Sequence, residues 1–225
     1  MDVMQFTQAL SRIWVLETRL LDKTKVERML EANSADEVLK ILGETEYANI
    51  MGNIKRAADY EEILSTELKR VYKLVYELCP VKEIVDLMST KYKYHNIKVL
   101  LKGKFLEKDL SNMLIDLGRE DLNELKRKID TDNFRDLKGN VEKAVLEVIS
   151  DFEANKDPQK IDIIVDRYMF KELDEIKKSL NYKFTDKLVN AMIDSTNVRT
   201  LLRVKKQGKG REFASEVLVT GGAIS

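Results

Sequence analysis

The side chains best suited to covalent or metal chemistry are scarce in this sequence. Cys79 and His95 are its only cysteine and its only histidine. A catalytic thiol needs a base within hydrogen-bonding reach, and nothing in the sequence orients one of these residues on the other. One thiol and one imidazole also fall short of the ligand sets of structural zinc sites. We therefore predict no catalytic residue, no metal site and no cofactor, and we expect Cys79 to be a small core residue.

A cluster of basic residues near the end of the chain is the clearest charged feature. Its six cations are Arg199, Arg203, Lys205, Lys206, Lys209 and Arg211. The glycines at 208 and 210 resemble a phosphate-binding loop only weakly, because no G-x-x-x-x-G-K-[ST] pattern is present. Nucleic-acid modules usually interleave aromatic residues for base stacking, and only Phe213 is near. The cluster thus favours a protein partner, or no partner, over nucleic acid.

The composition predicts an all-α protein of the cytoplasm. Hydrophobic residues make up 44% and charged residues 35%, with nine Gly and two Pro, which is typical of long, exposed helices. The 39 basic and 39 acidic residues balance, so no net field attracts a polyanion. No apolar run approaches the roughly 20 residues that cross a bilayer, and the N-terminus lacks a secretory signal. We therefore expect any contact with a membrane to be peripheral.

The helices that would position these residues follow from apolar spacing and from capping signals. Ser34 and Glu37 predict a capping box at the start of a short helix that ends at Gly43. Polar residues before Pro158 predict a domain linker at 153–158. The other predicted helices cover residues 3–30, 59–78, 81–88, 106–117, 121–129, 140–152, 161–180 and 185–206.

The most informative pattern is an internal repeat. Residues 96–102 (NIKVLLK) match residues 197–203 (NVRTLLR) at a constant offset of 101, and upstream apolar residues coincide at the same offset. With two additional residues in the loop, residues 110–115 align with 213–218, and Gly118 aligns with Gly221. The sequence therefore predicts two homologous helical repeats, at 1–118 with the N-terminal helices and at 119–225.

Three segments, taken together, resemble a known family. They are residues 12–21 (RIWVLETRLL), 94–102 (YHNIKVLLK) and 196–206 (TNVRTLLRVKK). In this order they resemble the C subunit of the archaeal and bacterial A/V-type ATPases, which is called the d subunit in eukaryotic V-ATPases. The resemblance spans essentially the whole chain, and none of the three motifs is an active-site signature.

The resemblance implies a non-catalytic role. Family members are funnels of three homologous helical domains around a pseudo-threefold axis, so this chain is predicted to lack the third repeat. Such a protein is a socket that joins the D and F subunits of the central stalk to the proteolipid ring in the membrane. It would contact the membrane only through that ring, in a complex that transports ions or synthesises ATP. The ion, proton or sodium, and the direction of the reaction are not specified, because the ion sites belong to the ring.

Specific residues can be assigned to this role. We predict partner contacts at Lys98, Lys102, Arg199 and Arg203, for which ordinary solvated side chains are the competing interpretation. The repeated motif predicts structural roles for Asn96, Leu100, Leu101, Asn197, Leu201 and Leu202. The alternative function is a helical-repeat adaptor that binds a partner helix or peptide in its groove. An enzyme that uses Cys79 or His95 is the remaining alternative.

Overall fold

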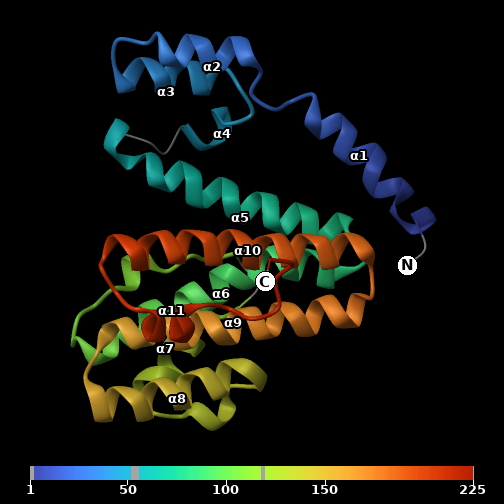
Figure 1. The fold of residues 1–225 in the computed structure, drawn as a ribbon. Coiled ribbons are helices and arrows are strands. Elements are labelled where there is room, and N and C mark those ends of the chain that lie inside the picture. The colour runs from blue at the N-terminus through green and yellow to red at the C-terminus, as the bar shows by residue number, and fades with distance from the viewer. Residues whose placement is uncertain (1–2, 52–55, 118–119, 225) are drawn as a thin grey trace. The chain divides into compact units, whose positions relative to one another are not determined.

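The structure is a computed structural model that describes residues 3–51, 56–117 and 120–224. Every regular element in these ranges is a helix, so the predicted all-α class is confirmed (Figure 1). Residues group into two compact units by their contacts. The N-terminal unit contains Asp2–Val81 and Asp116–Glu120, and the C-terminal unit contains Lys82–Ile115 and Asp121–Ser225. The repeat boundary predicted at Gly118 lies outside the described residues and stays a prediction.

The N-terminal unit consists mainly of short helices. Its elements are η1 (Val3–Phe6), α1 (Thr7–Glu17), α2 (Lys23–Leu30), α3 (Ala35–Gly43), α4 (Ala48–Met51), η2 (Ala57–Asp59) and α5 (Tyr60–Leu78). The prediction of one helix over residues 3–30 is wrong, because Asp22 begins a new helix by accepting a hydrogen bond from Lys25 N–H at 2.8 Å. This backbone hydrogen bond, followed by that of the Lys25 side chain, lowers the pKa of the Asp22 carboxyl.

The predicted cap of α3 is confirmed with one change. Ser34 Oγ accepts from Glu37 N–H at 3.2 Å, and the helix ends at Gly43. The Glu37 carboxylate, however, accepts from Asn33 N–H at 2.9 Å, one residue before the position expected for a capping box.

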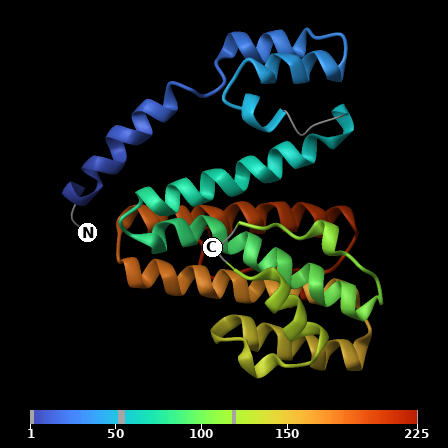
Figure 2. The same cartoon turned by 180° about the vertical axis from the view of Figure 1, so that it is seen from behind.

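The C-terminal unit contains the long helices. Its elements are α6 (Lys82–Phe105), η3 (Ser111–Met113), α7 (Leu122–Asp130), η4 (Phe134–Asp136), α8 (Gly139–Asn155), α9 (Pro158–Leu180), α10 (Lys183–Lys206) and α11 (Arg211–Val217). Helix α9 packs against α6, α8 and α10. Figures 1 and 2 show α8, α9 and α10 side by side in that order.

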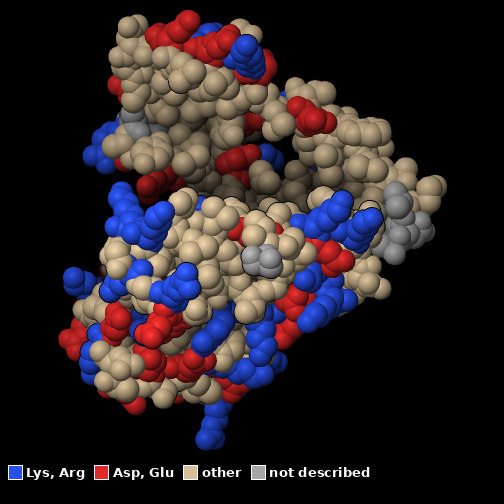
Figure 3. All heavy atoms as spheres, viewed as in Figure 1, with Lys and Arg blue, Asp and Glu red and all other residues tan. Residues whose placement is uncertain are grey.

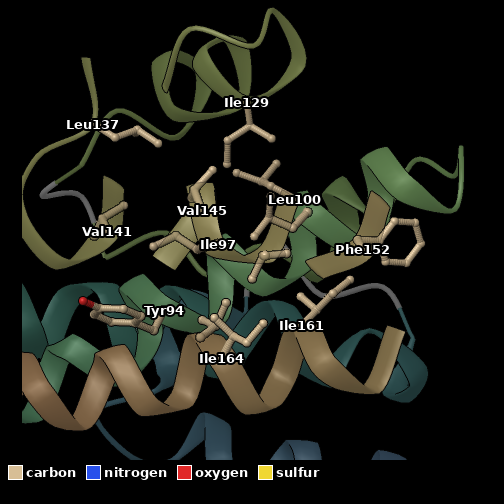
Figure 4. Close-up of a cluster of buried hydrophobic side chains, with 13 residues drawn as sticks. Tyr94, Ile97, Leu100, Ile129, Leu137, Val141, Val145, Phe152, Ile161 and Ile164 are labelled. Atoms are coloured by element: carbon tan, nitrogen blue, oxygen red, sulfur yellow. The ribbon is translucent and has the colours of Figure 1, made fainter. Parts of the chain in front are cut away.

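The main hydrophobic core of this unit lies where α6, α8 and α9 meet. Ile97 and Leu100 of α6 point toward Val145 of α8 and Ile164 of α9, and Ile129 of α7 closes one side (Figure 4). Ile97, Leu101, Val145 and Ile129 are completely buried. A smaller core joins α9 to the N-terminal half of α10 through Phe170, Leu173, Val189 and Ile193, with Leu87 of α6.

The helices predicted over 81–88 and 106–117 differ from the structure. The helix predicted over 81–88 continues without a break through Asn96 to Phe105, because apolar residues are buried on several faces of α6 and hide its periodicity. The α-helix predicted over 106–117 is wrong. Glu107, with φ of 51°, ends α6, and only the 3₁₀ turn η3 follows.

The predicted linker at 153–158 is also wrong. Helix α8 continues to Asn155, Lys156 adopts a left-handed conformation, and Asp157 caps α9 by accepting from Gln159 N–H at 2.9 Å. Pro158 occupies the first turn of α9, where its missing N–H is tolerated. The segment is therefore a tight turn between two helices that pack against each other.

Candidate partner-binding surface

Ion pairs fix the register of α6 against α9. Lys98 Nζ lies 2.8 Å from Asp166 Oδ1, and Lys102 Nζ lies 2.7 Å from Asp162 Oδ2. The two lysines are four residues apart on α6, the two aspartates are four residues apart on α9, and their order is reversed, so the helices run antiparallel. Lys93 also pairs with Glu172. Partly exposed pairs add little stability each, but together they favour one alignment of the two helices.

The repeated asparagines make the same pair of hydrogen bonds. Asn96 Nδ2 donates to Ile115 O at 2.9 Å, and Ile115 N–H donates to Asn96 Oδ1 at 2.8 Å. Asn197 Nδ2 donates to Val219 O at 2.8 Å, and Val219 N–H donates to Asn197 Oδ1 at 2.9 Å. Each amide satisfies both polar groups of one backbone residue in the segment that follows its helix. We call these two arrangements the amide clamps.

The ends of α6 and α10 are equivalent as well. Glu107 has φ of 51° and Gly208 has φ of 67°. In each copy the next residue bonds back to the helix: Lys108 N–H donates to Gly103 O at 2.9 Å, and Lys209 N–H donates to Val204 O at 3.1 Å. This is the Schellman arrangement at both ends. The glycine-rich loop at 208–210 is therefore explained as a helix terminus.

The segment after the helix is longer in the second copy than in the first by three residues, one more than the two that the sequence alignment predicts. From the residue that bonds back to the helix end to the residue held by the clamp, the chain runs 7 positions in the first copy (Lys108 to Ile115) and 10 in the second (Lys209 to Val219), a difference of three. A Cβ at Gly103 would lie 2.9 Å from Lys108 O, whereas its counterpart, Val204, is a buried side chain. The segment thus passes closer to α6 than its counterpart passes to α10.

A groove runs between α9, α10 and α11, with a volume of about 620 Å³. Its lining combines Asp162 and Asp166 of α9, Arg203 and Thr200 of α10, and Phe213 of α11. Lysine and arginine side chains gather around the end of α10 that leads into α11 (Figure 3). In the part of the chain that the structure describes, neither Arg199 nor Arg203 makes an ion pair. Arg199 Nε donates to Ser195 O at 3.2 Å.

Asp174 lines the same groove and remains ionised to lower pH than an ordinary aspartate. Hydrogen bonds from Lys177, and then from Lys178, lower the pKa of its carboxyl. The Asp174 carboxylate therefore stays negatively charged over a wider range of acidic pH.

Helix α10 exposes apolar side chains that its counterpart buries. Val198, Leu201 and Leu202 are 48%, 47% and 64% exposed, and we call these three residues the α10 apolar strip. At the offset of 101 they correspond to Ile97, Leu100 and Leu101, which are 0%, 6% and 0% exposed. The same residue types are core in one copy and surface in the other.

Comparison with known proteins identifies the family. Residues 9–225 match the ATP synthase (C/AC39) subunit family. The chain belongs to this family. The resemblance predicted from residues 12–21, 94–102 and 196–206 is thereby confirmed, and these segments lie in or next to α1, α6 and α10.

Relatives in this family are named as the C subunits of V-type and A-type ATPases. That of the V-type sodium ATPase of Enterococcus hirae is 30% identical over 209 residues, covering 92% of this chain and 63% of the relative. That of the A-type ATP synthase of Methanocaldococcus jannaschii is 22% identical over 240 residues, covering 98% of this chain and 59% of the relative. The A-type relative of Thermococcus onnurineus is 22% identical over 233 residues, at 95% and 61%. The chain spans less than two thirds of the length of these relatives.

Cys79 and His95 each contact a backbone carbonyl within their own unit. The buried Cys79 Sγ donates to Val81 O at 3.1 Å, and His95 Nε2 lies 2.9 Å from Met113 O. Over residues 3–51, 56–117 and 120–224, no group of three or more His, Cys, Asp or Glu side chains is placed to hold a metal. Within the same ranges, no helix has the length and apolar character that crossing a bilayer requires.

Of the predicted contact residues, Lys98 and Lys102 are held in ion pairs within the chain, and Arg203 faces the groove. Sequence reasoning did not identify the partners of the two lysines, Asp166 and Asp162 of another helix. The signal that could have indicated these two ion pairs is the shared spacing of four residues, between the lysines at 98 and 102 and between the aspartates at 162 and 166.

Proposed function

We propose that this chain is a central-stalk subunit of a rotary V/A-type ATPase. In this role it is a non-catalytic socket that couples the shaft, made of the D and F subunits, to the proteolipid ring in the membrane. The coupled reaction is ATP-driven ion transport or ATP synthesis. The observation that carries the proposal is the family match over residues 9–225. A protein in this role is cytoplasmic and meets the membrane only through the ring.

The helical architecture supports a role in transmitting force. Helices α6, α9 and α10 contain 24, 23 and 24 residues, so each is about 35 Å long. Their close packing and the ion pairs between α6 and α9 oppose sliding of one helix along the other. A coupling part needs this stiffness, because a soft element would absorb the rotation that it has to transmit.

The charged end of α10 supports a contact with a protein partner. Arg199 and Arg203 lack ion-pair partners among the described residues, and Lys205 and Lys206 are exposed beside them. A contact through these cations would follow charge complementarity. A partner that binds Lys98 or Lys102 would instead have to share the lysine with its intramolecular carboxylate, Asp166 or Asp162 respectively, or displace that carboxylate.

Binding to the stalk tests the proposal. We would mix the chain with purified D and F subunits of a V/A-type ATPase and determine the mass of the complex by size-exclusion chromatography with light scattering. The full-length Enterococcus hirae relative serves as the positive control. We expect a complex whose affinity falls about tenfold for the double variant Arg199→Glu, Arg203→Glu. The control is Lys183→Glu with Lys187→Glu, the same charge change at the same spacing on α10.

A helical-repeat adaptor remains the second candidate, favoured by the groove of about 620 Å³ and by the exposed apolar strip. The two candidates differ in what they need. An adaptor binds a helix or peptide in the absence of stalk and ring. If the positive control binds the D and F subunits and this chain does not, the socket proposal is wrong for this chain and the adaptor becomes the better account.

A further inference from the structure

The segment after α11 returns to α10 and is held there at two points (Figure 1). We call this segment, Val219–Ile224, the latch. The second amide clamp holds its first residue, Val219. The Asp194 carboxylate holds its other end, because it accepts from the N–H groups of Ala223 and Ile224 at 3.2 Å and 3.1 Å. Asp194 precedes the asparagine of the clamp by three positions, so both anchors lie on the same face of α10.

The glycines of the latch are required by the closeness of this contact. A Cβ at Gly222 would lie 2.1 Å from Asp194 Oδ1 and 3.1 Å from Ile193 Cγ2. Gly221 has φ of 101°, a conformation that residues with a Cβ rarely adopt. At the position equivalent to Asp194 the first copy has Lys93, which pairs with a carboxylate of α9. The first copy therefore cannot form the carboxylate anchor.

The latch covers apolar surface and forms part of the groove wall. Val219 packs on the smaller core, and Gly222 lies against Ile193 of that core, which is 1% exposed. Residues 218–221 line the groove between α9, α10 and α11. The remaining side chains of the latch are exposed. A segment with so few buried apolar contacts opens at a lower free energy than the helices around it.

We propose that the latch is a gate to this groove, and that its residues leave α10 together while α9 and α10 stay packed. Because the two anchors hold both ends of one short stretch of backbone, release of either end frees the other. Opening removes part of the groove wall and exposes Ile193. Closure is directional, since a carboxylate that accepts two backbone N–H groups makes charge-assisted hydrogen bonds. The proposal does not depend on the stalk partners.

Amide hydrogen exchange of the intact chain, resolved at single residues by NMR, tests whether the latch opens as a unit. We expect the N–H groups of Val219, Ala223 and Ile224 to have similar protection factors, below those of the core amides of α9 and α10. Asp194→Ala should accelerate exchange of all three by at least about tenfold, although Val219 bonds to a different side chain. Asp186→Ala is the control, because it removes the same charge from an exposed position of the same helix.

Binding of anilinonaphthalene sulfonate (ANS) tests whether opening exposes apolar surface. Asp194→Ala should raise ANS fluorescence at least about twofold over the unchanged chain. Gly222→Ala displaces the latch by steric contact and should have the same effects on exchange and on fluorescence. Its control is Gly210→Ala, since Gly210 has φ of −79° and no atom lies within 4 Å of the added Cβ. Circular dichroism confirms that each variant keeps its helices.

Three results would overturn the gate. Unchanged exchange in Asp194→Ala would show that the carboxylate does not hold the latch. Acceleration confined to Ala223 and Ile224, with Val219 unchanged, would show that the segment frays one residue at a time. An unchanged ANS signal in a variant with accelerated exchange would show that opening uncovers no apolar surface. Binding of the D and F subunits is measured separately, so failure of the gate leaves that proposal intact.

Discussion

At the residue scale, Asn96 shows how one side chain fixes an irregular segment. Its amide pairs with both polar groups of Ile115, in a stretch without a helix of its own to satisfy them. The sequence predicts a structural role for Asn96 and Asn197 because they recur at a fixed offset. It does not predict their partners, which lie 19 and 22 residues away along segments of different length.

Loss of the first clamp should destabilise the chain. We expect Asn96→Ala to lower the free energy of unfolding by about 1–3 kcal/mol, because Asn96 is 3% exposed and its removal leaves the partly buried backbone groups of Ile115 unpaired. Asn197→Ala should have a smaller effect, since Asn197 is only half-buried. Urea denaturation followed by circular dichroism measures both. The exposed Asn123→Ala is the control, and an equal, negligible effect of all three would contradict the role of the clamps.

At the element scale, amphipathic helices were predictable and the exceptions have physical causes. Helices α7, α8 and α9 lie within about three residues of their predicted bounds, because each exposes one polar face. Helix α10 also lies close to its predicted bounds, although it exposes apolar side chains. For helix α6 the sequence predicts only the first part, over residues 81–88, because the helix is buried on several sides and has no single polar stripe. The segment after α6 has helical spacing in sequence, but a left-handed residue and an amide clamp keep it extended.

The end of α10 should be sensitive to a side chain at one glycine. Gly208→Ala is expected to cost about 1 kcal/mol of stability, because φ of 67° strains any residue with a Cβ. Space is not the cause, since no atom lies within 4 Å of the added Cβ. Gly43→Ala is the control: Gly43 ends α3 without a positive φ, and its Cβ would make only an ordinary contact at 4.0 Å. Equal unfolding midpoints for the two variants would show that the left-handed turn contributes nothing.

At the scale of the whole molecule, the sequence predicts that α6 and α10 are equivalent, but it does not predict that their apolar faces differ in exposure. Both copies carry leucines at the same positions, so sequence alone assigns Leu201 and Leu202 the structural role of Leu100 and Leu101. Exposure depends on what covers this face of the helix: α8 and α9 bury Ile97, Leu100 and Leu101 of α6, whereas α9 packs on α10 through other residues, Val189 and Ile193. The predicted contact residues divide in the same way, because Lys98 and Lys102 have carboxylates to bind.

Equivalent truncations in the two copies should therefore have unequal effects. Leu101→Ala is expected to lower the free energy of unfolding by about 2–5 kcal/mol, because it opens a cavity in a fully buried core. Leu202→Ala, at the equivalent position and 64% exposed, should change it by less than about 0.5 kcal/mol. Chemical denaturation of the pair compares them directly, each serving as the other's control. A large loss for Leu202→Ala would mean that this strip is already covered in solution.

Helix α9 covers the apolar face of α6 but is synthesised after it, which has a consequence for the nascent chain. The apolar face of α6 is buried by residues up to Val165, which follow Leu101 by 64 positions (165 − 101). At roughly 5–20 residues per second, a ribosome needs about 3–13 s to make that stretch. During this interval α6 is complete but its cover does not exist. Nascent chains in which α6 has left the ribosome but α9 has not yet been made would therefore present an open aliphatic surface to chaperones, and chains released after residue 180 would not.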